Sequence, residues 1–369
     1  YPTFGGSGVM ATELGMSLVN HGHEVHFIAY KKPVRLTDLN QNLHFHKVNV
    51  PDYPLFSFVP YELALSTKLV DVVKNNSIDV LHVHYAIPHA YAAYMAKKML
   101  KEQSINIPIV TTLHGTDITL VGNHPSYKTA VTFSINKSDI VTCVSQSLKE
   151  DTLDQFDIKK EIVVIPNFID ISKYIIQQDL CLHENPIPAK EFIISHVSNF
   201  RPVKNVTNVI KIFYNIQKQL KAQLLMIGEG PEKSVAEDLC KELGISHLVK
   251  FLGNTNQVEK NLCHSDLFLL PSSAESFGLA ALEAMASKVA VISSNAGGLP
   301  EINIDGETGY VEDFDNIDEM SKKAISILSS KEQLDSFKNK AFLKAKEYDI
   351  NNLVPLYEKT YQMALDSIK

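Results

Sequence analysis

The sequence predicts an α/β protein built from two doubly wound domains. Short β-rich runs alternate with helical stretches along almost the whole chain, a pattern typical of parallel sheets covered by helices. This alternation is interrupted once, at residues 168–190, and then resumes. The length of 369 residues is enough for two domains of ordinary size. Because ligands of such sheets bind at the carboxyl ends of the strands, we expect a binding cleft where the two domains face each other.

The first half carries five short β-rich runs. We expect strands at residues 24–28, 79–83, 109–113, 140–144 and 162–165, with helical stretches such as 9–20 and 90–100 between them. Pro166 and Asn167 then break the pattern, so the first domain is predicted to cover residues 1–167. Only four residues precede the glycine run at Gly5, and we expect the strand that would feed this turn to be missing from the chain.

The second half repeats the alternation after a loop-like stretch. Residues 168–190 contain Pro186 and Pro188 among residues of mixed polarity, and we interpret them as the linker between the domains. A second domain is predicted at residues 191–348, with strands at 192–197, 223–227, 248–252, 267–270 and 289–292. The amphipathic segment 349–369 is expected to form a last helix.

Composition and charge argue against several classes of function. The net charge is −7 and the pI is about 6.1, so no global basic field attracts nucleic acid or anionic lipid. No apolar run approaches the roughly 18 residues of a membrane span, and we expect a cytoplasmic protein without membrane binding. The four cysteines show no CxxC spacing, so we predict reduced thiols rather than disulfides or a zinc site: Cys143, Cys181, Cys240 and Cys263.

A glycine run, Gly5-Gly6-Ser7-Gly8, stands directly before the helix that we expect to start near Val9. A helix N-terminus presents free N–H groups, and glycines let the backbone approach a phosphate closely. The spacing is neither that of the dinucleotide-binding GxGxxG motif nor that of a Walker loop. A phosphate contact and a plain tight turn both fit this run.

The strand expected at 192–197 is followed by the run Ser198-Asn199-Phe200-Arg201-Pro202-Val203-Lys204-Asn205. Its two cations, Arg201 and Lys204, lie where a nucleotide binds in a doubly wound domain. They can neutralise a diphosphate and stabilise it as a leaving group. The alternative is a solvated basic loop with no ligand.

The strand expected at 267–270 is followed by the run Glu275-Ser276-Phe277-Gly278-Leu279-Ala280-Ala281-Leu282-Glu283. We expect Glu275 in the loop and Glu283 about one turn into the next helix, so both can point toward one ligand. A carboxylate accepts two hydrogen bonds and therefore suits sugar or ribose hydroxyls. Backbone N–H groups near Gly278 can hold a phosphate. The alternative is helix capping by Ser276 with one exposed helical Glu.

Polar side chains also follow two strands of the first half. His114 lies in a strand-end loop and can donate a hydrogen bond to a sugar hydroxyl. His82 and His84 alternate with Val83 in a strand, and we expect one of them to be a satisfied core histidine. Tyr85 ends that strand and can point toward a ligand at the same edge.

Taken together, these runs resemble the retaining GT-B glycosyltransferases, a large family that includes sucrose synthase and many bacterial mannosyltransferases. The resemblance covers nearly the whole chain, and the run from Glu275 to Glu283 is its most specific element. It implies two Rossmann-like domains facing a cleft, and a last helix, 349–369, that packs back on the N-terminal domain. One departure concerns the family's usual phosphate-binding Arg, because Asn199 stands at that position and Arg201 follows two residues later.

A closer resemblance is to the branch of the family that forms N-acetylglucosaminyl-malate, the first intermediate of bacillithiol. It rests on four runs: Tyr1-Pro2-Thr3-Phe4-Gly5-Gly6-Ser7-Gly8, His82-Val83-His84-Tyr85-Ala86-Ile87-Pro88-His89-Ala90, Thr112-Leu113-His114-Gly115-Thr116-Asp117-Ile118-Thr119 and Ser198-Asn199-Phe200-Arg201. It implies UDP-N-acetylglucosamine (UDP-GlcNAc) as donor substrate, with no further cofactor. It implies L-malate, a small dicarboxylate, as acceptor for the N-terminal domain. Related enzymes are often dimers, so a homodimer is open.

The resemblance also implies roles for individual residues. The catalytic set would be His114, Arg201, Lys204 and Glu275. The donor would meet Gly6, Asn199, Arg201, Lys204, Glu275, Phe277, Gly278, Leu279 and Glu283, with Glu283 on the ribose hydroxyls. The acceptor would meet Ser7, Tyr85 and Thr112. No metal ligands are expected, because Arg201 and Lys204 would supply the counter-charge for the leaving diphosphate.

Three other functions stay open on the sequence alone. The first is a related retaining glycosyltransferase that uses a polysaccharide or a lipid-linked sugar as acceptor. The second is an enzyme like the UDP-GlcNAc 2-epimerases, which would release UDP without an acceptor. The third is a sensor that binds a nucleotide sugar and never turns it over, against which the presence of both carboxylates and both cations argues.

Overall fold

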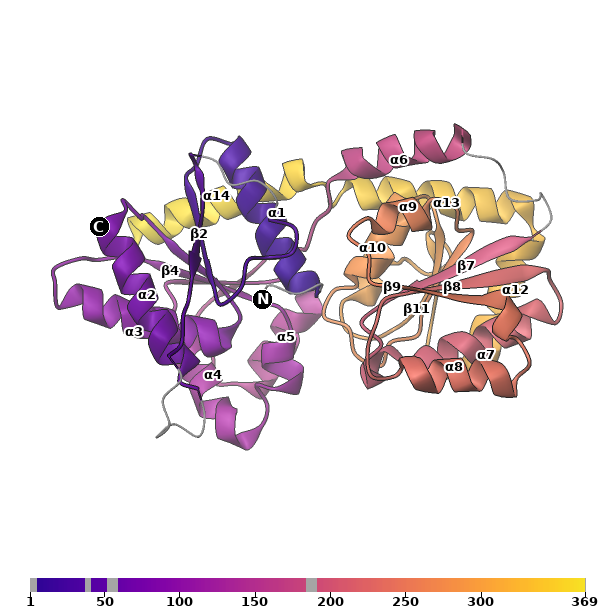
Figure 1. The fold of residues 1–369 in the computed structure, drawn as a ribbon, viewed down its shortest axis with the longest axis horizontal. Helices are drawn as coiled ribbons and strands as arrows, with labels where there is room; N and C mark the ends of the chain where they lie inside the picture. Colours follow the sequence, from indigo (N-terminus) through magenta and orange to yellow (C-terminus); the bar gives the residue numbers. More distant parts are fainter. Residues whose placement is uncertain (1–4, 37–40, 52–58, 184–190, 369) are drawn as a thin grey trace. The chain divides into compact units, whose positions relative to one another are not determined.

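The computed structural model describes residues 5–36, 41–51, 59–183 and 191–368, which form two compact units (Figure 1). The first unit comprises residues 1–167 together with 350–369, and the second comprises residues 168–349. The first four residues of the N-terminal motif, Tyr1-Pro2-Thr3-Phe4, lie outside the described residues, as do Pro186 and Pro188 of the expected linker. The two units are described separately below.

The first unit contains the following elements in chain order: α1 (Gly6–Asn20), β1 (Val25–Ala29), β2 (Leu43–Lys47), α2 (Tyr61–Asn75), β3 (Leu81–His84), the π-helical turn η1 (Ala86–Ala90), α3 (Tyr91–Lys101), β4 (Ile109–Leu113), the π-helical turn η2 (Thr116–Leu120), α4 (Pro125–Lys137), β5 (Ile140–Cys143), α5 (Gln146–Gln155), β6 (Ile162–Val164) and α14 (Ile350–Asp366). Strand β1 pairs with β2, and β3, β4, β5 and β6 form a second sheet in that order. Each of these pairings is parallel, as the alternating sequence predicts.

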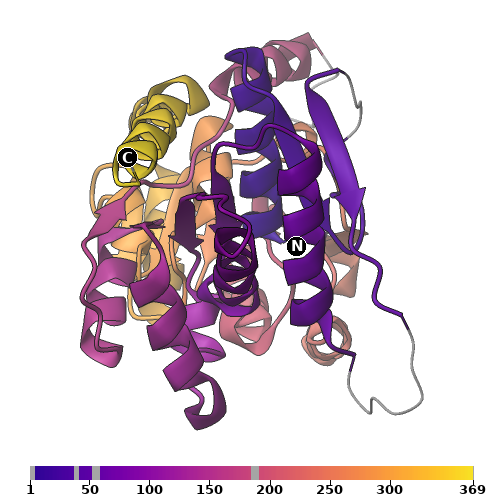
Figure 2. The same cartoon turned by 90° about the vertical axis from the view of Figure 1, so that its left-hand side faces the viewer.

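Helices cover the four-stranded sheet of the first unit (Figure 2). α2 packs against α3 and α3 against α4, and a buried apolar cluster that includes Leu65, Leu69 and Leu100 lies between these helices and the strands. Strand β4 is buried at all five positions. The last helix, α14, contacts α1 and β4, so residues at the two ends of the chain complete one unit.

The second unit contains the following elements in chain order: α6 (Ile171–His183), β7 (Phe192–Val197), the 3₁₀ turn η3 (Pro202–Lys204), α7 (Val206–Gln217), β8 (Ala222–Ile227), α8 (Lys233–Glu242), the 3₁₀ turn η4 (Ser246–Leu248), β9 (Val249–Gly253), α9 (Val258–Leu262), β10 (Leu267–Leu270), α10 (Leu279–Ala286), β11 (Ala290–Ser294), α11 (Leu299–Ile302), β12 (Gly309–Glu312), α12 (Ile317–Ser329) and α13 (Lys331–Lys346). Its sheet has the order β12-β11-β10-β7-β8-β9, with each neighbour pair parallel.

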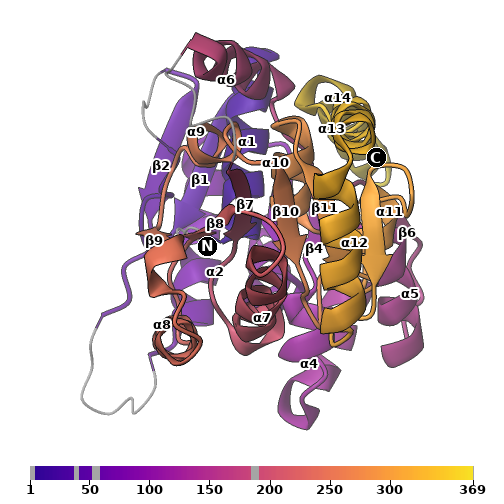
Figure 3. The same ribbon diagram turned by 90° about the vertical axis from the view of Figure 1, so that its right-hand side faces the viewer.

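This strand order makes the second unit a doubly wound domain (Figure 3). α7 packs against α8 and α12, while α9 packs against α6 and α10. β10 reads as four successive apolar residues and is fully buried, because a central parallel strand is covered on both of its faces. The order reverses between β7 and β10, and the carboxyl ends of strands at such a switch point are where ligands of this fold bind.

The strands that we expected are confirmed to within two residues, but two expectations about other elements were wrong. Helix α1 begins at Gly6 rather than near Val9, so the glycine run forms the first helical turn instead of preceding it. The segment 168–190 is not a plain loop, because it contains α6, whose turns are stabilised by packing on α9 and α10. The sequence reading also missed β2 and β12, which are short strands with few apolar residues.

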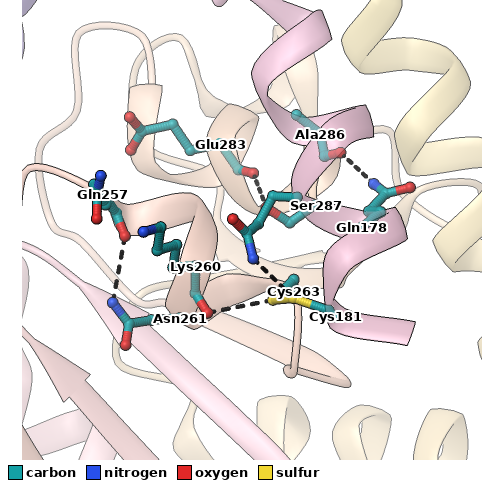
Figure 4. Close-up of a disulfide and its surroundings, with 10 residues drawn as sticks. Gln178, Cys181, Gln257, Lys260, Asn261, Cys263, Glu283, Ala286 and Ser287 are labelled. Carbon is teal, nitrogen blue, oxygen red and sulfur yellow. Dashed lines mark hydrogen bonds between the residues drawn. A yellow bond between two sulfur atoms is a disulfide. The ribbon is translucent and has the colours of Figure 1, made fainter. Parts of the chain in front are cut away.

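The expectation of four reduced thiols was also wrong. Cys181 and Cys263 form a disulfide across a sequence separation of 82 residues, whereas Cys143 and Cys240 are free and buried. The bond joins α6 to the end of α9, close to the end of α10 (Figure 4). There Gln178 donates a hydrogen bond of 2.8 Å to the carbonyl of Ala286. Such a pair cannot be found from spacing, because the fold alone brings the two cysteines together.

None of the helices in the described ranges combines the length and the apolar character that crossing a membrane would need.

Candidate active site

The loops that follow β3 and β4 bring the predicted polar residues of the first unit together. The two strands are adjacent and in register, with His84 opposite Thr112, so Tyr85 and His114 leave the sheet at the same edge. Tyr85 has φ of +81°, a backbone conformation that residues other than glycine rarely adopt. Its N–H donates to the Thr112 carbonyl at 2.8 Å. This backbone geometry turns the Tyr85 ring out of the strand direction.

Hydroxyl and imidazole groups form a network at this edge. The Tyr85 hydroxyl donates to Oγ of Ser7, in the first turn of α1, at 2.5 Å. Nδ1 of His84 lies 2.8 Å from Nε2 of His114, so one of these nitrogens carries the shared proton and the other accepts it. The rings of Tyr85 and His114 also pack with centroids 5.2 Å apart. The structure therefore brings Ser7, Tyr85 and His114 together, and their roles toward the acceptor and the sugar stay predictions.

The histidines of this network are neutral at physiological pH. Burial lowers the pKa of His114 to about 3, with smaller contributions from the charges of neighbouring histidines. Burial lowers the pKa of His89 to about 4 and that of His84 well below its usual value. A neutral imidazole can donate one hydrogen bond and accept another, so this edge can orient hydroxyl groups.

Asp117, which the sequence reading quoted only as part of a run, organises both loops. One carboxylate oxygen accepts from the Ala86 N–H at 2.8 Å, and the other accepts from the Gly115 N–H at 3.1 Å. Burial raises the pKa of Asp117 to about 6, against the lowering effect of these backbone hydrogen bonds. Asp117 thus ties the loop after β3 to the loop after β4.

Thr112 differs from its predicted role. Its hydroxyl is fully buried and lies 2.7 Å from both Nε2 of His82 and Oγ1 of Thr142. His82 in turn is 2.8 Å from the hydroxyl of Tyr361 on α14, which makes it the satisfied core histidine that we expected. These bonds make Thr112 a positioning residue beneath the site, because its hydroxyl is already engaged within the core.

In the second unit, the two predicted ligand-binding runs lie on either side of the switch point. The run Ser198–Asn205 follows β7, and the run from Glu275 to Glu283 follows the neighbouring strand β10. The two loops are joined directly, since the side-chain amide of Asn205 donates to the Pro271 carbonyl at 2.9 Å and the Ser273 N–H donates to the Val203 carbonyl at 2.8 Å.

A partly buried ion pair connects the predicted cation to the predicted carboxylate. Nζ of Lys204 lies 2.5 Å from Oε2 of Glu275, and the two side chains are only 18% and 16% exposed. With so little water nearby, the attraction between these charges is screened less than at the surface. Lys204 and Glu275, which are 71 positions apart in the sequence, are therefore held together as an ion pair at the edge of this sheet.

Helix α10 presents the second carboxylate. Gly278 precedes the helix with φ of +100°, and a Cβ there would lie 2.5 Å from Leu299, so only glycine fits. Glu283 lies in the second turn and is 8% exposed, while Phe277 is buried and Leu279 begins the helix. The N-cap residue, Gly278, has no side chain to cap the helix, and the N–H groups at a helix N-terminus are of the kind that bind an anion.

The structure does not join every predicted donor residue to this group. Arg201 and Asn199 are exposed in the loop after β7, and within the described ranges the Arg201 side chain forms no hydrogen bond or ion pair. Gly6 is exposed at the start of α1 in the first unit, where Gly5 provides no side-chain cap. Whether these three residues meet a donor phosphate stays a prediction.

Comparison with known proteins agrees with this geometry. Residues 4–173 match the family described as Glycosyltransferase Family 4, and residues 179–344 match the family described as Glycosyl transferases group 1. The chain belongs to these glycosyltransferases, and with two Rossmann-like α/β units it is a GT-B enzyme of the hexosyltransferase class. One relative is N-acetyl-alpha-D-glucosaminyl L-malate synthase of Bacillus anthracis, which is 44% identical over 90% of this chain and 87% of its own length.

Solved structures support the same fold. Sucrose-phosphate synthase from Thermosynechococcus elongatus has a TM-score of 0.79 at 19% identity and covers 98% of this chain and 94% of its own. Anabaena Alr3699/HepE, solved in complex with UDP, has a TM-score of 0.77 at 17% identity and covers 98% and 97%. These likenesses confirm the predicted fold class.

Proposed function

We propose that this enzyme transfers N-acetylglucosamine from UDP-GlcNAc to the hydroxyl of L-malate, with retention of the α configuration, as the first step of bacillithiol biosynthesis. The observation that carries the proposal is the 44% identity to a relative named for that product, over 90% of this chain. The arrangement of charges in the second unit and of neutral polar groups in the first is consistent with it.

The second unit would bind the nucleotide sugar. Lys204 and Arg201 would neutralise the diphosphate, which leaves as UDP and gains negative charge in the transition state. Glu275 holds Lys204 in place at 2.5 Å before any substrate arrives. Glu283, near the start of α10, would accept hydrogen bonds from the ribose hydroxyls. With two cations at the leaving group, this mechanism needs no metal ion.

The first unit would hold the acceptor and the sugar. Ser7 and Tyr85 offer paired hydroxyls to the malate, and the neutral imidazole of His114 would hydrogen-bond a sugar hydroxyl. The N–H groups in the first turn of α1 are without a side-chain cap and would attract an anionic group, either the donor phosphate or a malate carboxylate.

Retention is best explained by attack from the face that UDP leaves. The bond between the anomeric carbon and the phosphate oxygen breaks as the malate hydroxyl forms its bond to that carbon, and the hydroxyl proton passes to the leaving phosphate oxygen. A double displacement would need a free carboxylate nucleophile. Asp117, which accepts the His114 N–H, is unsuited to that role because both of its oxygens accept backbone N–H groups. Catalysis would come from positioning and charge stabilisation.

The deciding experiment measures UDP release from UDP-GlcNAc with and without L-malate, with mass spectrometry and NMR of the product. We expect malate-dependent release and an α-linked N-acetylglucosaminyl-malate. Release without malate, with N-acetylmannosamine formed, would replace the proposal with an epimerase. Release only with a saccharide or lipid-linked acceptor would change the acceptor, and donor binding without any turnover would indicate a sensor.

A further inference from the structure

The two-stranded sheet of the first unit carries a cluster of histidines that the transfer reaction does not use. β1 and β2 pair in parallel with His26 opposite His44 and Ile28 opposite His46. Because side chains of a strand alternate between its faces, His26, His44 and His46 all lie on one face, and Glu24, two residues before His26, lies there too.

The side-chain atoms of three of them converge on one point. Oε1 of Glu24 lies 3.1 Å from Nε2 of His26 and 2.9 Å from Nε2 of His44. The three atoms lie within 4.8 Å of one another, which is the separation expected of ligands around one metal ion. The His26 and His44 rings are stacked with centroids 4.4 Å apart, which points both Nε2 atoms the same way.

The hydrogen bonding of this cluster is incomplete without a further ligand. Nε2 of His44 is buried and has no hydrogen-bond partner among the described residues, since the approach of Glu24 at 2.9 Å is close enough for an ion pair but not directed along a hydrogen bond. A buried nitrogen without a partner is costly, and it is free to bind a cation through its lone pair.

A third histidine fixes the orientation that a metal would need. Nδ1 of His26 lies 2.8 Å from Nε2 of His46. If Nδ1 of His26 carries the proton and donates it to His46, Nε2 of His26 keeps its lone pair for a metal. A metal-bound histidine usually donates its other ring N–H to a neighbour in this way. His46 would therefore act as a positioning residue and not as a direct ligand.

A second pair of histidines shows what an ordinary carboxylate contact looks like in this protein. Nδ1 of His21 and Nε2 of His23 each lie 3.0 Å from Oε1 of Glu358. Their side chains are 30% and 50% exposed, whereas that of His26 is 6% exposed and that of His44 is 34% exposed. Within the described ranges, the three atoms of this second group do not converge to metal-binding distances, and no third histidine orients either ring.

We propose that Glu24, His26 and His44 bind one divalent ion of the zinc type, with His46 positioning His26. Two imidazole nitrogens and one carboxylate oxygen are ligands that suit Zn²⁺ and its neighbours in the first transition row better than Mg²⁺ or Ca²⁺. The ion would bridge β1 and β2, and it would replace the direct contacts that Glu24 makes with His26 and His44. It would stabilise this sheet and take no part in sugar transfer, because none of the predicted acceptor residues Ser7, Tyr85 and Thr112 lies on β1 or β2.

The test is a Zn²⁺ titration by calorimetry on the full chain, without a histidine tag and after treatment with a chelator. We expect one equivalent to bind and the melting temperature of the protein to rise. The double variant H26Q/H44Q should lose this binding, and H46Q should weaken it by about 10- to 100-fold. The matched control H21Q/H23Q should bind Zn²⁺ as the unchanged protein does.

Two further measurements separate loss of the metal site from unfolding and from metal binding elsewhere in the protein. Glu24 has a 59% exposed side chain, so E24Q should fold normally and still bind Zn²⁺ at least about tenfold more weakly, even if H26Q/H44Q does not fold. A Co²⁺ spectrum should lack thiolate charge-transfer bands, because such bands would place the ion at the other group of candidate ligands, Cys181, Cys263 and His264. Binding that persists in E24Q and H26Q/H44Q, or no binding at all, would overturn the proposal. Transfer activity should be the same with and without Zn²⁺.

Discussion

The two units share a doubly wound architecture but present opposite chemistry at the edges of their sheets. In the first unit, the loops after β3 and β4 carry hydroxyl groups and neutral histidines, such as Tyr85 and His114. In the second, the loops after β7 and β10 carry an ion pair of low exposure, Lys204 with Glu275. Neutral groups orient hydroxyls, whereas fixed charges stabilise a diphosphate as it leaves.

This difference shows that loops at equivalent strand ends can serve either hydrogen bonding or charge stabilisation. Which of the two they serve depends on the side chains in the loop and on their partners. Histidine rings of the first unit pack at a tilt against one another and against Tyr85, and burial lowers the pKa of His84 well below its usual value. Lys204 has a carboxylate beside it, so its partly buried charge is compensated. The fold supplies the position, and the loop side chains supply the chemistry.

The largest expected difference between the units is their response to acid. Burial lowers the pKa of His82 and His114 to about 3 and that of His89 to about 4, and His84 is lowered as well. As the pH falls below 6.5, the unfolded chain binds protons that the folded unit does not, at a cost of about 1.4 kcal/mol per pH unit for each such histidine. The stability of the first unit should therefore fall from pH 6.5 toward pH 4.

The pKa values of two other buried groups, Asp117 and His196, bear on this difference in acid stability. Asp117 works in the opposite direction, because its raised pKa lets the folded state bind a proton first as the pH falls through about 6. In the second unit, His196 is the histidine whose pKa burial lowers, to about 4. Hydrogen exchange should show β3–β6 amides losing protection at a higher pH than those of β7–β10. Simultaneous loss of protection would contradict this difference.

The charged site is tested by K204A. Removing this cation should lower kcat by at least about 10²-fold, because it would no longer stabilise the leaving diphosphate. Steady-state UDP release measures the effect. The control is K233A, which removes a lysine that pairs with Glu229 near the surface of the same unit, and its kcat should be unchanged. Near-normal turnover of K204A would remove Lys204 from the mechanism.

The positioning role of Asp117 is tested by D117N. An amide cannot accept both backbone N–H groups as a carboxylate does, so we expect a loss of stability of about 1.5–3 kcal/mol and a lower kcat. The matched control is D139N, because Asp139 accepts the Ile109 N–H at the opposite end of β4. D139N should be less stable. Its kcat, measured well below the unfolding temperature of the variant, should be unchanged. Equal effects on kcat would leave Asp117 with a purely structural role.

The smallest predicted effect is that of Y85F. Loss of the hydrogen bond to Ser7 should cost about 0.5–1.5 kcal/mol, which corresponds to a rise of no more than about tenfold in KM for L-malate with little change in KM for UDP-GlcNAc. Initial rates at varied malate measure it, with Y127F on the exposed face of α4 as control. A selective rise in KM for the donor would move Tyr85 out of the acceptor subsite.

Sequence patterns predicted much of this site because strand ends are marked by a change from apolar to polar residues. The runs after β7 and β10 could be placed at one edge, since parallel strands end together. Asp117 and Gly297 were missed as organising residues: Asp117 acts through backbone N–H groups of two loops, and a Cβ at Gly297 would lie 1.9 Å from the Glu275 carbonyl. Neither contact leaves a periodic signal.

The sequence by itself determined the two α/β halves, their parallel strands and the residues offered at the strand ends, because these depend on local propensity and on alternation along the chain. Only the tertiary structure decided which of those residues meet. Lys204 pairs with Glu275, Ser7 with Tyr85 and Cys181 with Cys263. Contacts between residues so far apart depend on strand order and helix packing, which no single stretch of sequence encodes.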